Sequence, residues 1–295
     1  MRVLLIDLLV ERAEFGHGGN QEVIRPMAKI SNVEVFLVTP QMQSFEAGEK
    51  VQDKTNVKLE EIDVPNWDYD YDFWSESKVE LEGRTIKFNR IIMPMNDNED
   101  EMSNWLKKMD LDAVVCSGSR RNVSIWEKWM SPTEILFRAA AKSGIPTLGI
   151  CFGHQLLCHS LGSKVERAEK FTSGIWNLEL TKEGENDELL TNHTEDIREI
   201  ATLFSHQDHV MSVPKNCILL SRTSHNDITA IRVNDDLGNP LPAWGIQFHP
   251  EAVKKRIERA YDWGHISKEE YKSLRGEHDG SGILSSFAKI VAEKM

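Results

Sequence analysis

A cysteine between two glycines is the residue of this sequence best placed for covalent chemistry. Cys151 lies in the run Gly149-Ile150-Cys151-Phe152-Gly153, after a short apolar segment and before a helix-like one. Glycines permit a tight strand-to-helix turn that presents a nucleophile to a substrate, and bulky residues would block it. The start of the following helix would favour the thiolate. The Phe152 backbone N–H would point at the same place and could serve as an oxyanion donor.

A histidine and a glutamate occur much later in the chain, in the run Trp244-Gly245-Ile246-Gln247-Phe248-His249-Pro250-Glu251. Residues 244–247 have strand character, so His249 and Glu251 are expected just beyond a strand end. His249 can accept the thiol proton and later return it to a leaving amine, while Glu251 holds the ring and stabilises its charged form. A lone His-Pro-Glu is more often an ordinary loop. Together with Cys151, however, it predicts a Cys-His-Glu catalytic unit.

A second histidine cluster raises the question of a metal. His206 and His209 flank Asp208 in the segment 205–210. Two histidines beside an aspartate can bind zinc, but a catalytic zinc site has three protein ligands, and the sequence shows no third. We therefore expect no metal and no cofactor, and we interpret the segment as a hydrogen-bonded loop at the rim of the site.

The composition is typical of a soluble globular enzyme. Of the 295 residues, 40% are hydrophobic and 28% are charged. Apolar runs fall short of the roughly 20 residues needed to span a bilayer, and the apolar N-terminal stretch is too short for a signal peptide. We therefore expect a cytoplasmic protein without a membrane partner. The net charge of −12 argues against a nucleic-acid partner. The four cysteines include no C-x-x-C pair, which indicates reduced thiols.

Strand-like and helix-like segments alternate along the first half of the chain. Strand-like segments are expected at 1–6, 33–38, 112–116 and 146–150, and helices at 131–143 and 155–161. The second half is richer in strand-like segments and ends in two helical stretches, 252–263 and 282–294. This order predicts an α/β fold with a mainly parallel central sheet flanked by helices on both faces. Ligands of such sheets bind at the carboxyl ends of the strands, where Cys151 is expected.

We expect one catalytic domain over residues 1–295 with two probable insertions. The first, near 54–82, is acidic and aromatic and has little periodicity. The second, near 254–280, follows the histidine-glutamate motif directly. Both are natural places for partner docking or for control of substrate access.

The two motifs closely resemble those of the class I glutamine amidotransferases, a family with a Cys-His-Glu triad. The order and spacing of 149–155 and 244–251 agree with that family. The segment 205–210, with Pro214 soon after, is similar to stand-alone members that resemble the glutaminase domain of GMP synthase. The resemblance covers roughly residues 110–251 well. It implies a flavodoxin-like fold whose nucleophile elbow carries Cys151.

The resemblance also implies a reaction. Cys151 would attack the γ-amide of glutamine, ammonia would leave, and a γ-glutamyl thioester would be hydrolysed to glutamate. The backbone of Gly118 and Ser119 would hold the oxyanion together with Phe152. Gln155 would help to shape the glutamine pocket, and His206 is expected to bind the substrate as well. Ammonia would pass to a synthase that aminates an activated acceptor.

The sequence departs from the family in the oxyanion loop. The usual Gly-Gly-Pro reads Gly118-Ser119-Arg120 here, followed by Arg121. A positive φ at Ser119 would be strained. We hypothesise that Arg120 and Arg121 contact a substrate carboxylate or an acidic partner; a solvated pair is the alternative.

Motifs of an ATP-using synthetase are absent from the sequence, since neither a Ser-Gly-Gly-x-Asp-Ser loop nor a Gly-x-x-x-x-Gly-Lys-Ser/Thr loop occurs. Together with the resemblance, this implies a possible partner, a separate ATP-dependent synthase subunit that receives the ammonia. Two other functions stay open. A γ-glutamyl peptide hydrolase would use the same triad without transferring nitrogen. A non-catalytic binding module is the third possibility, and the intact Cys151, His249 and Glu251 argue against it.

Overall fold

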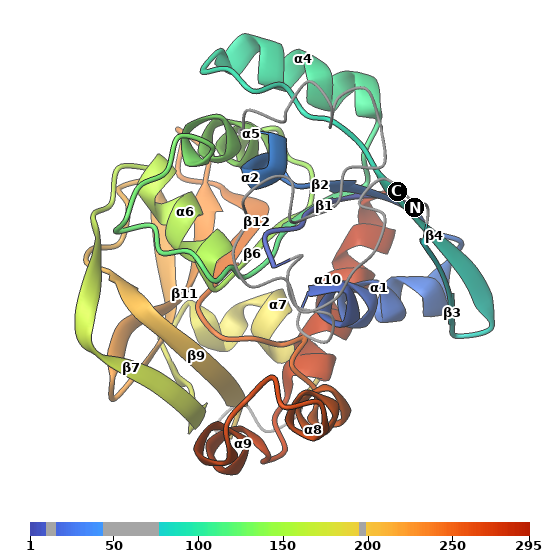
Figure 1. Ribbon diagram of the computed structural model, residues 1–295. Coiled ribbons are helices and arrows are strands. Elements are labelled where there is room, and N and C mark those ends of the chain that lie inside the picture. The colour runs from blue at the N-terminus through green and yellow to red at the C-terminus, as the bar shows by residue number, and fades with distance from the viewer. Residues whose placement is uncertain (10–15, 44–76, 195–198) are drawn as a thin grey trace.

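The computed structural model describes residues 1–9, 16–43, 77–194 and 199–295. These residues form a ten-stranded mixed sheet and a separate two-stranded ribbon (Figure 1). In spatial order the sheet contains β3 (Ser77–Leu81), β4 (Arg84–Arg90), β2 (Glu34–Val38), β1 (Arg2–Ile6), β5 (Ala113–Cys116), β6 (Thr147–Ile150), β12 (Pro240–Ile246), β11 (Asn226–Asn234), β10 (Cys217–Thr223) and β8 (Glu179–Leu180). The ribbon pairs β7 (Val165–Asn177) with β9 (Ala201–Val210).

The centre of the sheet is parallel and its two edges are antiparallel. All neighbouring pairs from β4 through β2, β1, β5 and β6 to β12 run parallel. The β3–β4 pair and the pairs from β12 outward to β8 run antiparallel. The predicted mainly parallel sheet is therefore confirmed. The antiparallel half corresponds to the strand-rich second half of the sequence.

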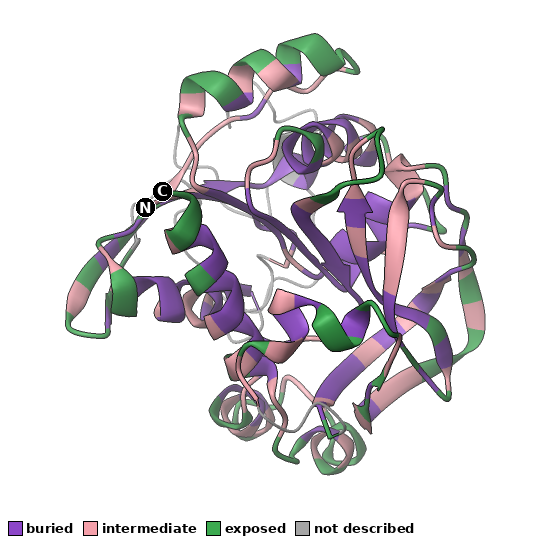
Figure 2. Cartoon of the chain, turned by 180° about the vertical axis from the view of Figure 1, so that it is seen from behind, coloured by how far each residue is buried: buried purple, intermediate pink, exposed green. Residues whose placement is uncertain are grey.

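Helices cover both faces of the sheet. One face packs against α1 (Gly18–Ile30), α7 (Glu188–Thr191) and α10 (Gly280–Lys294), and the other against α4 (Glu99–Met109), α5 (Met130–Lys142) and α6 (Phe152–Ser160). Strand β1 shows how the sequence produces this arrangement, because alternate side chains of a strand point to opposite faces. Val3 and Leu5 belong to the first core, and Leu4 and Ile6 to the second. The central strands are accordingly buried almost throughout (Figure 2).

One predicted loop is a strand. The segment 205–210 lies within β9, which extends to Val210. Burial alternates along this strand, as expected when one side faces the protein and the other faces partly outward. The interpretation of this segment as a loop was wrong. Its buried positions carry polar side chains, including His206 and Asp208, so the sequence lacks the alternation of apolar and polar residues that indicates a strand.

The two predicted insertions have different outcomes. Most of the 54–82 segment lies outside the described residues, and its last part forms β3 and the turn toward β4. The 254–280 segment contains two helices, α8 (Lys254–Asp262) and α9 (Lys268–Leu274), which lie beside β9 in Figure 1. A further short helix, α2 (Pro40–Gln43), and a 3₁₀ turn, η3 (Gly184–Asn186), complete the described elements.

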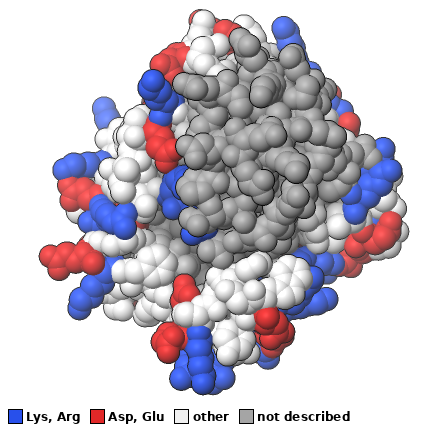
Figure 3. Space-filling view, viewed as in Figure 1, with Lys and Arg blue, Asp and Glu red and all other residues white. Residues whose placement is uncertain are grey.

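The surface is mixed in charge. On the face shown in Figure 3, basic and acidic side chains are interspersed over the described residues without a broad area of one sign. Within the described ranges, no helix has both the length and the apolar character needed to cross a membrane.

Candidate active site

Cys151 lies at a strained turn between β6 and α6. Its backbone has φ 50° and ψ −99°, a positive-φ conformation that few non-glycine residues adopt. The flanking glycines are required by close approach. A Cβ on Gly153 would lie 2.4 Å from the Cys116 carbonyl oxygen, and one on Gly149 would lie 2.7 Å from the Gly153 backbone. The sequence thus builds the predicted elbow, and such strain is commonly found at functional sites.

His249 and Glu251 reach the elbow because their strand is the neighbour of the cysteine's strand. Ile246 of β12 pairs with Ile150 of β6, so the residues that follow both strands emerge at the same edge of the sheet. His249 Nδ1 lies 2.8 Å from Glu251 Oε1. The His249 backbone N–H donates to the Leu203 carbonyl on β9 at 2.7 Å. The imidazole is therefore oriented by a carboxylate and anchored by a backbone hydrogen bond.

The electrostatics distinguish Cys151 from the other cysteines. Burial lowers the pKa of His249, but Cys151 and Glu251 together raise it well above its usual value, which favours the imidazolium. Burial alone raises the pKa of the Cys116 thiol, and it raises the pKa of Cys217 to about 12. Burial and the nearby Cys217 raise the pKa of Cys158. These three remain thiols at neutral pH, whereas Cys151 has an imidazolium partner.

Gly118 and Ser119 follow β5, next to the elbow. A Cβ on Gly118 would lie 2.9 Å from His249 Cε1 and 3.8 Å from the Cys151 Cβ, so this backbone passes directly beside the histidine and the cysteine. Positive φ occurs at three described non-glycine residues, and Ser119 is not one of them. The strain considered for Ser119 is therefore absent. The first residue of α6 is Phe152, so its N–H is one of the unpaired donors at a helix N-terminus.

One cavity of about 320 Å³ brings most of the predicted site residues together. Gly118 lies beside His249, although it does not line the cavity itself. The predicted residues that line the cavity are Cys151, His249, Glu251, Ser119, Arg120, Phe152, Gln155 and His206.

Gln155 and His206 are fixed to the same backbone carbonyl. Gln155 Nε2 donates to the Asp208 carbonyl at 3.0 Å and to Gln247 Oε1 at 3.1 Å. His206 Nδ1 donates to the same carbonyl at 3.1 Å. Burial, followed by the nearby His209, lowers the pKa of His206 to about 3, so the ring is neutral. Within the described ranges, His, Cys, Asp and Glu form no group of three or more that could hold a metal.

The two arginines of the oxyanion loop differ in their contacts. Arg121 forms an ion pair with Glu127 at 3.5 Å, whereas Arg120 forms none with the described residues. Both line the cavity. Asp208 anchors the chain just after these arginines. Its carboxylate accepts hydrogen bonds from the Ser124 backbone N–H and hydroxyl, both at 2.8 Å.

The part of the cavity lining contributed by α8 and α9 was not predicted from the sequence. This wall of the cavity is formed by side chains from α8, α9 and their connection, and by one aromatic residue of β7. These residues are Ile257, His265, Ile266, Glu270, Leu274 and Phe171. A signal for α9 was present, because Ser267 and Glu270 form a capping box at its start. The contacts of this wall with the cavity required the structure.

Comparison with known families matches residues 75–261 to the model "Glutamine amidotransferase class-I". That range contains the elbow, the oxyanion loop and the histidine-glutamate pair. The chain belongs to the class-I glutamine amidotransferase family. The prediction of an enzyme of this family is thereby confirmed.

Relatives and solved structures agree with this assignment. The amidotransferase chain is 27% identical over 212 residues to a glutamine-hydrolysing GMP synthase subunit of Pyrococcus abyssi, covering 71% of this chain and 91% of that protein. It is 36% identical over 146 residues to a glutamine-hydrolysing GMP synthase of Thermus thermophilus, which is 48% of this chain but 25% of that protein. A glutamine amidotransferase structure from Thermotoga maritima has a TM-score of 0.59 at 17% identity, covering 99% of this chain and 98% of that one, which shows a shared fold.

Proposed function

We propose that this class-I amidotransferase hydrolyses the γ-amide of glutamine through a covalent thioester on Cys151. The observation that carries the proposal is the meeting of Cys151 with a glutamate-paired histidine in one cavity. A strained cysteine elbow beside an imidazolium has the two properties that acyl transfer needs, which are a thiolate and a proton donor for the leaving group.

The first half of the reaction forms the thioester. The Cys151 thiolate attacks the γ-carbonyl carbon, and the carbonyl electrons move to oxygen. The N–H groups of Phe152 and of the 118–119 backbone hold this oxyanion, which stabilises the transition state more than the ground state. Protonated His249 then gives its proton to the amide nitrogen, the C–N bond breaks, and ammonia leaves.

The second half releases glutamate. His249, now neutral, takes a proton from a water molecule, which attacks the thioester carbon through the same oxyanion geometry. The C–S bond breaks and restores the Cys151 thiolate and the protonated His249. Glu251 stabilises the imidazolium in both halves and transfers no proton itself.

Substrate recognition in this proposal uses three side chains of the cavity lining, Arg120, Gln155 and His206. Arg120 lines the cavity without an ion pair to a described residue, which suits it to a substrate carboxylate. Gln155 is fixed by two hydrogen bonds through its Nε2, so its position in the pocket is preset. His206, held neutral, forms part of the same lining.

We further propose that the ammonia is delivered to a separate ATP-dependent synthase subunit. The support is the Pyrococcus abyssi relative, a protein named as one subunit of a GMP synthase, which this chain matches over 91% of its length. By contrast, the chain spans a quarter of the Thermus thermophilus synthase, so the remaining length of that protein has no counterpart in the alignment.

The decisive experiment supplies the purified protein with glutamine and, separately, with γ-glutamyl dipeptides, and measures glutamate release. Glutamine turnover that depends on Cys151 supports the proposal. Faster turnover of the dipeptides would instead identify a γ-glutamyl peptide hydrolase. Adding a candidate synthase with its acceptor and ATP tests the partner, because transfer then produces an aminated product in step with glutamate.

A further inference from the structure

Only one of the two carboxylate oxygens of Glu251 has a hydrogen-bond partner among the described residues. Its Oε1 pairs with His249, but its Oε2 is buried and accepts no hydrogen bond from the described residues. A carboxylate that is anchored through one oxygen can still rotate about that hydrogen bond. Its orientation therefore depends on what packs behind it.

The element behind Glu251 is the start of α1. A Cβ on Gly19 would lie 3.1 Å from the Glu251 Cγ, so the helix backbone approaches the carboxylate stem directly. Glu22 lies three residues further along α1, and residues three apart share one face of a helix. The face of α1 that touches Glu251 therefore also presents Glu22.

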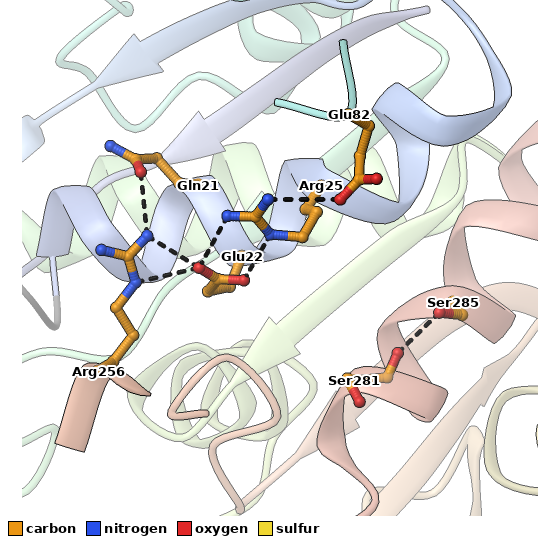
Figure 4. Close-up of polar contacts among 7 residues, drawn as sticks. All are labelled: Gln21, Glu22, Arg25, Glu82, Arg256, Ser281 and Ser285. Atoms are coloured by element: carbon orange, nitrogen blue, oxygen red, sulfur yellow. Dashed lines mark hydrogen bonds and ion pairs between the residues drawn. The ribbon is translucent and has the colours of Figure 1, made fainter. Parts of the chain in front are cut away.

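Glu22 binds the helix that follows the catalytic motif. Arg256 of α8 donates to Glu22 Oε1 through Nη2 at 2.8 Å and through Nε at 3.0 Å, and to Gln21 at 3.0 Å. Arg256 is 7% exposed, so this ion pair is shielded from solvent. On its other side Glu22 binds Arg25, which continues to Glu82 (Figure 4).

Arg256 follows Glu251 by five residues, and backbone hydrogen bonds tie the segment between them. The Val253 N–H donates to the Glu251 carbonyl at 2.9 Å, and the Arg256 N–H donates to the Val253 carbonyl at 2.8 Å. Two successive backbone hydrogen bonds thus join the segment that carries the carboxylate to the arginine. A displacement of Arg256 would be transmitted to Glu251.

We propose that Glu22 and Arg256 form a clamp between α1 and α8 that positions Glu251 behind His249. The inference rests on the proposed glutamine hydrolysis, because it assigns a positioning role within that reaction. The clamp residues do not touch the substrate. They act through Glu251, and Gly19 supplies the close contact that defines where the carboxylate stops.

The test compares two arginines that share one glutamate. In Arg256→Met the link to α8 is lost, whereas in Arg25→Met the Glu22–Arg256 pair remains. We expect kcat for glutamate release to fall about tenfold in Arg256→Met with KM unchanged, because small misplacements of a catalytic group are costly. Arg25→Met should stay within about twofold of the wild type in kcat. Equal losses in the two variants would overturn the clamp.

Gly19→Ala provides a variant that does not weaken the fold through its helix. Alanine has the higher helix propensity, so α1 itself should be stabilised. The new methyl group would nevertheless press on Glu251, and we expect kcat to fall about fivefold. In a Glu251→Ala background, both Gly19→Ala and Arg256→Met should cause no further loss. A loss that persists in that background would show that the residues do not act through Glu251.

Cys151 alkylation separates failure of the clamp from failure of the proposed function. A wild-type protein that releases glutamate from none of the substrates would refute the proposed function alone. The clamp is then judged by the rate of Cys151 labelling with iodoacetamide at neutral pH. Slower labelling in Arg256→Met and Gly19→Ala than in wild type and Arg25→Met supports it, since a displaced Glu251 weakens the thiolate–imidazolium pair. Equal rates would refute it.

Discussion

The proposed nucleophile and the proposed base of this site are held in different ways. Cys151 is directed by the turn that its neighbours in sequence form, in which Gly149 and Gly153 approach each other closely. This turn is docked on the sheet, because the Cys151 N–H donates to the Ile246 carbonyl of β12 at 2.8 Å. His249 and Glu251 are positioned by distant segments, namely the Leu203 carbonyl on β9 and the first turn of α1. A local turn docked on the sheet therefore directs the proposed nucleophile, whereas the proposed base depends on packing against segments that are distant in the sequence.

This difference teaches where mutations should act. Changes at the elbow glycines should alter the backbone and hence both folding and chemistry. Changes around the base should move a side chain within an intact fold. Four variants, taken from the largest expected effect to the smallest, test this contrast.

Cys151→Ala removes the nucleophile, and we expect glutamate release to fall about 10⁴-fold or more while the fold persists. Cys158→Ala, on the helix that follows Cys151, is the matched control. Because Cys158 is buried and remains a thiol, its loss should leave kcat unchanged and reduce the free energy of unfolding by about 1 kcal/mol. Steady-state kinetics and urea unfolding measure both effects. Residual turnover near the wild-type rate in Cys151→Ala would exclude the thioester route.

Gly153→Ala tests how closely the elbow packs against the end of β5. The added Cβ would collide with the Cys116 carbonyl, and we expect the free energy of unfolding to fall by about 2–4 kcal/mol with most activity lost. Gly144→Ala is the control, because Gly144 has φ 82° with open space around it, and it should cost about 1–2 kcal/mol and leave kcat unchanged. If Gly153→Ala were as stable as Gly144→Ala, the elbow would be less constrained than its geometry indicates.

Glu251→Gln tests the base side through its pH dependence. The raised pKa of His249 keeps the leaving-group acid protonated, and activity is lost as the pH rises through that pKa. Removing the carboxylate charge lowers this pKa, so the alkaline limb of the kcat profile should move to lower pH. At the optimum we expect kcat to fall about 10- to 100-fold with normal stability. An alkaline limb that does not move would mean that Glu251 does not stabilise the imidazolium.

Arg120→Ala tests the part of the cavity lining that follows Gly118 and Ser119. Loss of a charge-assisted contact with a substrate carboxylate should raise KM for glutamine about tenfold with little change in kcat. Arg121→Ala should have a smaller effect, because Arg121 already pairs with Glu127. Substrate-saturation kinetics of both variants decide the matter. If KM is unchanged in both, neither arginine binds the substrate carboxylate.

The same contrast explains how much could be predicted from the sequence. The central strands were predictable because their buried runs are continuous, and the segment expected at 112–116 is Ala113–Cys116 in the structure. The elbow was predictable because its glycines and cysteine are adjacent in the chain.

Other features depend on contacts that no local pattern records. The long ribbon strand β7 is partly exposed and irregular, with a register shift between Arg167 and Thr172, so it lacks a clear alternation. The wall made by α8 and α9 requires knowing which residues face the cavity. The contact of Gly19 with Glu251 joins residues from opposite ends of the chain, and its only trace in the sequence is a glycine at a helix start.

The pairing of β6 with β12 has a consequence for how the molecule reaches its native state. These neighbouring strands come from distant parts of the chain, and β12 stands between β6 and the antiparallel strands β11, β10 and β8 at one edge of the sheet. Until β12 docks, β6 is an edge strand with open backbone groups, which is a site of self-association. Non-local pairings of this kind form slowly. We expect early folding intermediates to aggregate through β6, and catalytic competence to be acquired together with protection of this edge.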